Sequence, residues 1–541
     1  MKRIFACLVA IGLLHQLPPV RAEEPVDWEV VTRIREEGFS RSQVMETLRH
    51  LTDAIGPRLT GSPGMAEANE WTRRRLEEWG LHNARLEPWG PFGRGWTFER
   101  VTVHMTEPRS TVVFALPQAW TPSTAGPVRG EVRVASLERA ENLEPLRGQV
   151  RGQILLLSED REPSREDEPA LRRYDRDGLR ALTELPLDDS RAPRPDFRAR
   201  ARERWAFARQ RNQFLADEGV VATFEMSSRD GGILRVGAAG SREPGQSVGV
   251  PALVMSAEQF RWIGRLVEAG RRVVLELDVS TTFHDAGLMA ANTVAEIRGG
   301  NLRHELVMVG AHLDSWHAAT GSNDNAAGVA VAMEAVRILR AIGVEPRRTI
   351  RVALWSGEEQ GLLGSRAYVR EHFASRPPPG DPELRDTPPS LWPETWPIQY
   401  HQDWDRFSAY FNLDNGSGRI RGVYTQGNLG VVPIFESWLR PFHDVGADTV
   451  TNRNTGGTDH LPFDAVGLPG FQFIQDSLDY STRTHHTNLD HLDHASAADL
   501  QQASVVMASF LYHAAMRDQK LPRKPKPRPA PQGPPAGETG G

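Results

Sequence analysis

The sequence predicts an α/β fold, with a mixed and mostly parallel central sheet flanked by helices and a β-rich unit inserted into it. Residues 285–515 alternate short apolar runs with segments whose apolar residues recur at helical spacing, the order typical of an α/β domain. Residues 111–279 change to short apolar strands such as 153–157. We place the insertion at residues 125–280 and the main domain at residues 23–124 and 281–517.

The first 22 residues have the charged, apolar and small-residue parts of a secretory signal peptide. Lys2 and Arg3 supply the charge, an apolar run extends from Ile4 to Leu14, and Ala22 ends the segment. This run is too short to span a bilayer comfortably, which favours a cleaved signal over a retained anchor or a buried helix. We expect cleavage after Ala22 and an exported protein, periplasmic or secreted.

Composition limits the chemistry and the partners of the mature chain. Its only cysteine, Cys7, lies in the signal segment, so we expect no disulfide and no cysteine ligand, and any metal must be held by His and carboxylate groups. An exported chain of 541 residues without disulfides is more typical of bacteria than of animals. The net charge of −6 argues against a broad basic surface for nucleic acid or an anionic membrane, and no later segment approaches membrane-spanning length.

Residues 27–85 are expected to form two helices joined by the turn-rich loop 55–63. Their apolar positions recur at helical spacing at Val44, Leu48, Leu51, Trp71, Leu76 and Trp79. Two further segments are expected to lie outside any core. The tract 159–211, dense in Arg, Asp and Pro, is expected to be solvated and partly mobile, and the tail 518–541 to be disordered.

Strands and helices alternate along the main domain. We expect strands at residues 306–309, 349–355, 407–413 and 471–474, and helices at residues 326–339, 361–373 and 500–516. The helix 326–339 carries Val329, Met333 and Val336 on one face. Open α/β sheets bind ligands at the carboxyl ends of their strands, so the residues that follow these strands are candidates for a site.

Three carboxylates and a histidine lie at such positions. His312 and Asp314 come just after the first of these strands, and Asp414 closes the third. A neutral histidine binds zinc through one ring nitrogen, and a carboxylate two residues on suits the other nitrogen. Asp324 opens the helix near residue 326, where it is an N-cap, a bridge between two cations, or both. Taken singly, His312 also fits a loop histidine and Asp414 a simple turn.

Glu358 and Glu359 are adjacent carboxylates directly after the core strand 349–355. Such neighbours repel each other unless a cation is close. If Glu359 binds a metal, Glu358 is free to take a proton from an activated water and pass it to a leaving amine. His486, in the polar cluster 484–491, adds an imidazole that is otherwise explained by local polar packing. Metal binding at one place in the fold explains all of these residues together.

Other catalytic classes lack their motifs. His304 and Glu305 begin like a zinc-protease helix, but Met308 stands where the second histidine would be, and the segment is predicted as a strand. The chain has no Gly-x-Ser-x-Gly elbow, no phosphate-binding loop and no dinucleotide fingerprint. A serine hydrolase or a nucleotide enzyme therefore has no support.

Two stretches of the main domain, 307–316 and 355–361, resemble the co-catalytic zinc exopeptidases, a family that includes secreted bacterial aminopeptidases and carboxypeptidase Q. The resemblance is strong over residues 285–515 and looser over the N-terminal helices, through Ile55 to Ser62. Segments Arg151 to Leu156 and Val250 to Ala252 resemble the protease-associated domain that is often inserted in such enzymes. The resemblance implies a zinc aminopeptidase-like fold.

The resemblance also implies two Zn²⁺ ions per chain, with Mn²⁺ or Co²⁺ able to occupy the same ligands. By position, Asp324 would bridge the ions. His312 and Asp414 would complete one ion's ligands, and Glu359 and His486 would complete the other's.

Further roles follow from the same resemblance. Glu358 would be the general base, and Asp314 would orient the ring of the first histidine ligand. His486 is preferred to His485 as the last ligand because the family places this ligand directly before Thr or Ser. The segment Thr458 to His460 matches a recurring family segment that supports the site.

The activity implied is that of a metal-dependent exopeptidase, which hydrolyses a peptide substrate near a free terminus through a water activated by two zinc ions. Two alternatives stay open: a non-catalytic, receptor-like binding protein of the same fold, and a single-zinc glutaminyl cyclase. All five ligand positions and the base are present, which favours the peptidase. Aminopeptidase, carboxypeptidase and dipeptidase preferences are not separated by the sequence, and neither is the oligomeric state.

Overall fold

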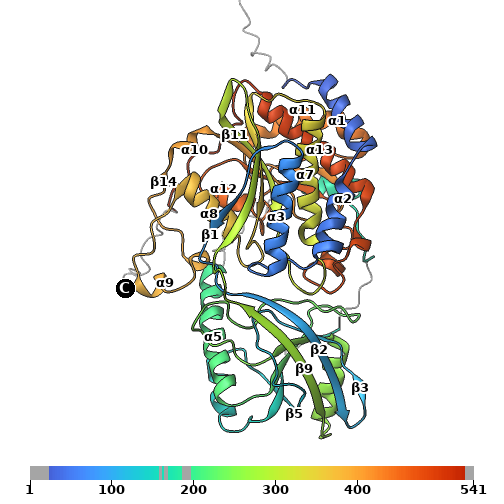
Figure 1. Cartoon of the computed structure of the whole chain (residues 1–541), viewed down its shortest axis with the longest axis vertical. Helices are drawn as coiled ribbons and strands as arrows, with labels where there is room; N and C mark the ends of the chain where they lie inside the picture. Colours follow the sequence, from blue (N-terminus) through green and yellow to red (C-terminus); the bar gives the residue numbers. More distant parts are fainter. Residues whose placement is uncertain (1–23, 158–160, 164–168, 185–196, 530–541) are drawn as a thin grey trace, which may run out of the picture.

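The computed structural model describes residues 24–157, 161–163, 169–184 and 197–529, so the predicted signal peptide lies outside the described residues. It contains two eight-stranded sheets, each in its own unit (Figure 1). In the upper part of Figure 1 the first sheet is flanked by helices, and the second sheet lies below it. Within these ranges, none of the helices combines the length and the apolar character needed to cross a membrane.

The first sheet is mixed, and the strands at its centre are parallel. In spatial order its strands are β1 (His82–Trp89), β10 (Ala290–Ile297), β12 (Arg348–Trp355), β11 (Leu302–His312), β15 (Phe407–Asn412), β18 (Gly470–Gln475), β16 (Ile420–Tyr424) and β17 (Thr449–Thr451). Neighbours from β12 through β18 run parallel, whereas β1, β10 and β16 pair antiparallel with their neighbours toward the centre. The predicted α/β fold class is confirmed.

Helices cover both faces of this sheet. One face carries α1 (Trp28–Ser40), α2 (Val44–Arg49), α7 (Ala327–Ala341) and α13 (Ala497–Met516), and the other carries α8 (Leu363–His372), α10 (Gln402–Arg406) and α12 (His460–Asp464). Side chains of β11 alternate between the two cores: Val307 and Val309 pack with the first group of helices, and Leu306 and Met308 with the second. Burial on both faces explains why this strand is continuously apolar.

The N-terminal loop is held next to the site by the helix that follows it. α3 (Pro63–Glu78) begins with Ser62 as its N-cap, whose hydroxyl accepts a hydrogen bond from the Met65 N–H, and Pro63 occupies the first turn. Thr60, two residues before this cap, is fully buried. The helix start therefore fixes the direction in which the loop enters the core.

The second sheet begins earlier in the chain than predicted. Its spatial order is β3 (Thr111–Val112), β2 (Gly95–Glu107), β9 (Val274–His284), β5 (Val128–Ala135), β6 (Gln153–Leu157), β7 (Ala222–Met226), β8 (Ala252–Met255) and β4 (Ala115–Pro117). β2 pairs with β9 from Gly95 opposite His284. The chain leaves the first sheet at Trp89, the end of β1, and returns to it at Ala290, the start of β10. These two residues pair with each other. We therefore propose residues 95–284 as the insertion, in place of 125–280.

The tract 159–211 is more ordered than predicted wherever the structure describes it. It contains α4 (Arg176–Thr183), and its end forms the first part of α5 (Phe197–Asp217). Arg173 lies 3.0 Å from Asp476 and 2.7 Å from Asp499, two buried carboxylates of the first unit. The charges that appeared to favour solvent are used in ion pairs with distant parts of the chain, which the sequence does not reveal.

The start of the C-terminal tail also differs from the predicted disorder. Leu521 is buried, the Arg523 guanidinium stacks 4.1 Å from the Trp404 ring, and Lys524 pairs with Asp464 at 2.5 Å. Contacts of this kind, including Lys526 over the Tyr400 ring at 4.1 Å, hold residues 518–529 on the first unit. The rest of the predicted disordered segment lies outside the described residues.

Candidate metal centre

The seven predicted site residues lie around the carboxyl ends of three adjacent parallel strands. His312 ends β11, Asp414 lies two residues beyond β15, and the Glu358–Glu359 pair follows β12. The remaining members come from loops: Asp314 follows His312, Asp324 lies in the turn before α7, and His486 lies in the loop before α13. Residues up to 174 positions apart in the sequence thus share one end of the sheet.

One cluster of donor atoms is centred on His312. Its Nε2 atom lies 3.3 Å from Asp324 Oδ1 and 3.4 Å from Asp414 Oδ1. All three side chains are almost completely buried. At the strand ends, one imidazole nitrogen and two carboxylate oxygens therefore face one another in a buried cluster.

A second cluster shares Asp324 with the first. His486 Nε2 lies 2.9 Å from Glu359 Oε2 and 3.4 Å from Asp324 Oδ2. The two carboxylate oxygens of Asp324 thus face different histidines, with Oδ1 toward His312 and Oδ2 toward His486. This is the arrangement that a bridging carboxylate requires.

A second observation also fits metal binding: several of the donor atoms are buried and lack a hydrogen-bond partner in the part of the chain that the structure describes. Asp324 Oδ2, Glu359 Oε1 and Asp414 Oδ1 are buried, and no described residue forms a hydrogen bond with them. A buried carboxylate oxygen without a partner is costly, because it loses hydration and gains nothing in return. Cations bound between these atoms would remove that cost, and the nitrogen and oxygen donors match the preferences of zinc.

The electrostatics of the clusters give the same indication. Burial raises the pKa of Glu358 well above its usual value, and the negative charge of Asp414 adds to the rise. Burial, together with the charge of Asp324, raises the pKa of Glu359 in the same way. Burial alone would lower the pKa of His312, but the carboxylates of Asp414 and Glu358 raise it well above its usual value. The carboxylates therefore create a strong demand for positive charge at this point.

Asp314 lies beside the ring of His312 and also holds the glutamate loop. The atom of Asp314 that faces His312 Nδ1, at 3.0 Å, is its main-chain carbonyl oxygen, whereas its carboxylate is 3.7 Å away. That carboxylate instead accepts hydrogen bonds from the N–H groups of Glu358 and Glu359, at 3.2 and 3.3 Å. The backbone carbonyl oxygen is thus the nearer partner of the His312 ring, and the carboxylate lies near the ring while it supports the glutamate loop.

Thr60 completes this arrangement and was not anticipated from the sequence as a site residue. Its hydroxyl donates to Asp314 Oδ2 at 2.9 Å and accepts from the Gly357 N–H at 2.9 Å. A turn-rich loop preceding a capped helix was the only sequence signal of its position. The N-terminal loop therefore supports the strand end that carries both glutamates.

Replacing Thr60 with Val should lower metal affinity or kcat about 10- to 100-fold, because the substitution keeps the volume but removes both hydrogen bonds. The bonds lost are buried, so we also expect a loss of about 1–3 kcal/mol in the free energy of unfolding. Metal content after dialysis, kcat and a denaturant titration measure these effects. Thr60→Ser is the matched control, because it retains the hydroxyl. Equal kcat and metal content in the Val and Ser variants would contradict the supporting role.

Two further buried residues hold the turn that carries Asp324. Asp490 accepts hydrogen bonds from the N–H groups of Asn323 and Asp324, at 2.6 and 3.1 Å, and burial raises its pKa to about 7. Arg58 is completely buried and donates to the carbonyl oxygens of Leu313 and Gly321, at 2.7 and 2.8 Å. Both lie in segments singled out from the sequence, at 484–491 and 55–63, but no local pattern identified them.

The geometry distinguishes the neighbouring histidines His485 and His486. His485 Nε2 is 3.9 Å from Asp324 Oδ2, farther than His486, and its ring packs 4.9 Å from the Tyr480 ring. Burial lowers the pKa of His485 to about 4, so it is neutral near pH 7. His460 lies outside both clusters, with Nε2 3.2 Å from the Thr455 carbonyl oxygen.

The second unit reaches the centre through one loop. Arg235 Nη2 lies 3.2 Å from His486 Nδ1, and the Val236 N–H donates to the His486 carbonyl oxygen at 2.9 Å. Arg235 also forms an isolated β-bridge with Thr487. The insertion thus holds the loop that carries the last candidate ligand, which the sequence could not indicate.

A cavity of roughly 510 Å³ opens onto both clusters. The cavity is lined by the segments around Tyr480 and 456–458 and by acidic and imidazole groups, those of Asp324, Glu358, Glu359, Asp414, His485 and His486. A cavity of this size admits a substrate side chain and the bond beside it. The arrangement can therefore bring a carbonyl group next to the candidate metal ligands and Glu358.

Comparisons with known proteins agree with this geometry. Residues 292–511 match the sequence profile of Peptidase family M28. Carboxypeptidase Q of Bos taurus is 24% identical over 494 residues, which cover 90% of this chain and 88% of the relative. Carboxypeptidase Q of Mus musculus is 26% identical over 275 residues, 51% of this chain, and that match spans about half of the relative, 52% of its length.

Solved structures share the fold over most of the chain. A peptidase M28 precursor from Shewanella amazonensis SB2B has a TM-score of 0.65 at 22% identity and covers 93% of this chain and 99% of its own. A zinc aminopeptidase from Bacillus subtilis has a TM-score of 0.52 at 18% identity, with coverage of 88% and 95%. At these identities the structural likeness concerns the fold.

Proposed function

We propose that this chain, whose residues 292–511 match peptidase family M28, is a zinc metallopeptidase of that family, an exopeptidase that cleaves a peptide bond next to a free terminus through a dinuclear zinc centre. The proposed ligands are His312 and Asp414 for one ion, Glu359 and His486 for the other, and Asp324 for both. The main observation behind the proposal is that the two carboxylate oxygens of Asp324 face different histidines, at 3.3 and 3.4 Å.

When bound, zinc ions supply Lewis acidity, which lowers the pKa of a water and polarises a carbonyl group. The chain's own contribution to proton transfer is assigned to Glu358. It lines the cavity beside the ligands, where a carboxylate can accept a proton and give it to the leaving amine. Asp314 and Thr60 keep the backbone of Glu358 in place. Mn²⁺ or Co²⁺ would suit the same nitrogen and oxygen donors.

The two alternative functions fit the donor set less well. A receptor-like binding protein would not explain why buried carboxylate oxygens without partners among the described residues lie beside a glutamate whose pKa is raised. A single-zinc cyclase requires one cluster, whereas Asp324 faces two. The exopeptidase accounts for every donor.

Removing the metal should abolish peptide hydrolysis, and zinc should restore it. The assay measures amino acids released from free dipeptides and from peptides blocked at the N- or the C-terminus, before and after treatment with a chelator, with metal per chain measured alongside. About two ions per chain and loss of cleavage with the chelator are expected. Loss of cleavage with a blocked N-terminus assigns an aminopeptidase, and loss with a blocked C-terminus a carboxypeptidase. Hydrolysis that persists without metal would refute the proposal.

A further inference from the structure

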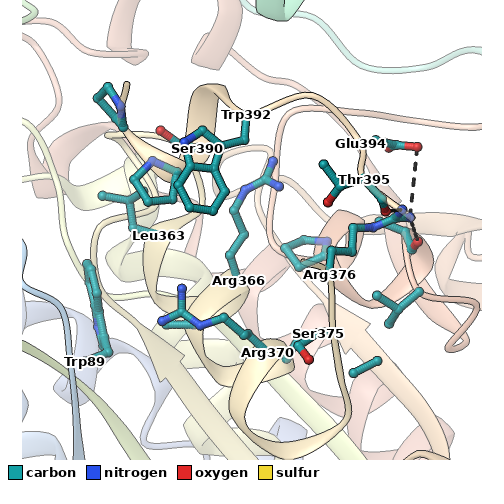
Figure 2. Close-up of a pocket in the computed structure, with 18 of the residues that line it drawn as sticks. Trp89, Leu363, Arg366, Arg370, Ser375, Arg376, Ser390, Trp392, Glu394 and Thr395 are labelled. Carbon is teal, nitrogen blue, oxygen red and sulfur yellow. Dashed lines mark hydrogen bonds and ion pairs between the residues drawn. The ribbon is translucent and has the colours of Figure 1, made fainter. Parts of the chain in front are cut away.

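A second cavity, of roughly 360 Å³, lies where the two units meet (Figure 2). The segment Trp89 to Pro91, which leads from β1 into the insertion, lines one side. Helix α8 and residues 374–377 of the first unit line another, and Arg198 and Arg242 reach it from the insertion. This cavity shares no lining residue with the cavity at the metal centre.

The charge of this cavity is strongly one-sided. Within the part of the chain that the structure describes, its lining contains five arginines and one carboxylate, Glu394; the arginines are Arg198, Arg242, Arg366, Arg370 and Arg376. Glu394 is shared by two of them, 3.6 Å from Arg198 and 4.0 Å from Arg376. Among the described lining residues, one carboxylate therefore accompanies five arginines.

Burial makes this excess of positive charge costly. Burial lowers the pKa of Arg242, Arg366 and Arg376, and the charge of Arg198 lowers two of these pKa values further. The opposing carboxylates outside the lining, Glu243 and Asp459, offset this only in part, because each pKa still ends below its usual value. Cations in a partly desolvated cavity are stabilised when an anion enters it.

The remaining walls are apolar and aromatic. Figure 2 shows Trp89 at one end of the cavity and Arg376 with Glu394 at the other, with Arg366 and Arg370 between them. Arg366 and Arg370 are one helical turn apart on α8, so their guanidinium groups can approach the same ligand. Leu363, Trp392 and several prolines contribute apolar surface, and Ser375, Ser390 and Thr395 add hydroxyl groups. Such a mixture suits a ligand with an apolar body and one charged end.

We propose that this cavity binds an organic anion, a carboxylate or a phosphate carried on an apolar body about the size of an aromatic ring system. Arginine guanidinium groups form paired hydrogen bonds with both headgroups, and Trp89 and Trp392 offer ring surfaces to the body. The site is separate from the metal centre but close to it along the chain. Arg366 donates through Nε to the Gly361 carbonyl oxygen at 3.1 Å, two residues after Glu359.

Isothermal titration calorimetry on the full metal-loaded chain tests the proposal. The probes are indole-3-propionate and phenyl phosphate, with the neutral indole-3-propionamide and inorganic phosphate for comparison. We expect at least one anionic aromatic probe to bind, and both the neutral amide and bare phosphate to bind at least tenfold more weakly. The stronger of the two aromatic probes identifies the preferred headgroup.

The double variant Arg198→Gln, Arg370→Gln should weaken binding of the preferred probe at least tenfold. Both side chains reach solvent, so the fold should tolerate the change, and Arg74→Gln on the exposed face of α3 is the matched control. Asp324→Asn should leave probe binding unchanged. The proposal is overturned if neither anionic aromatic probe binds, if the amide or inorganic phosphate binds as tightly as they do, if the double variant binds like the control, or if Asp324→Asn abolishes binding, which would place the probe at the metal centre.

Discussion

Replacing Glu358 with Gln is expected to lower kcat about 10²- to 10⁴-fold while leaving the bound metal nearly unchanged, because the amide keeps the shape of the side chain but cannot accept and return a proton. Glu358 lies in the cavity wall beside the proposed ligands, and its backbone N–H remains bonded to Asp314 in either case. A small change in KM is expected, since substrate binding does not depend on the lost proton transfer. Steady-state kinetics and metal analysis of the purified variant give both quantities.

Glu371→Gln is the matched control for this experiment, because it makes the same change at an exposed position of α8. It should retain kcat, KM and metal content. Two outcomes would contradict the assignment of the base. An unchanged kcat in the Glu358 variant would remove the residue from the chemistry, and a loss of one metal ion would make Glu358 a ligand.

Replacing Asp324 with Asn is expected to reduce the metal content from about two ions per chain to less than one, with activity falling below detection. The reason is that both clusters use this carboxylate: Oδ1 faces His312 and Oδ2 faces His486. The amide keeps the volume but loses the negative charge that holds two cations close together. Metal analysis after dialysis against a defined zinc concentration measures the effect.

Single-cluster variants distinguish a bridge from an ordinary ligand. Asp414→Asn and Glu359→Gln should each weaken the binding of one metal ion and leave the other ion bound, because Asp414 lies beside His312 and Glu359 lies beside His486. Asp386→Asn, at an exposed position, is the surface control and should retain both ions. Two tightly bound ions in the Asp324 variant, or the loss of both ions in either single-cluster variant, would refute the shared role.

Four strands of the first sheet, β11, β12, β15 and β18, were predictable because their signals are local. The continuous apolar run before His312 is found within β11, and the apolar residues that precede Glu358 form β12. Strands buried on both faces need apolar residues at every position, so the pattern survives whatever lies beside them. Because open α/β sheets bind ligands at the carboxyl ends of their strands, the candidate ligands were expected at strand ends, and in the structure they lie close together there.

Residues that act through distant contacts were not predictable in this way. Thr60 lies 254 positions before Asp314, to which it donates, and nothing in its own neighbourhood marks that bond. Arg58 carries a full charge into the core, where its partners are carbonyl oxygens that every sequence contains. The bounds proposed for the insertion differ from the predicted ones for the same reason. β2 joins the second sheet through its pairing with β9, which lies far along the chain.

The sequence by itself determined the α/β class, the strand ends that carry the candidate ligands, and the pair Glu358–Glu359, because periodicity and the order of residues along a strand are properties of short segments. The tertiary structure alone decided that Asp324 faces two histidines, that His486 lies closer to it than His485, and that five arginines surround one cavity between the units. Each of these depends on distances between segments that are remote in the chain, and such distances are set by packing and not by local pattern.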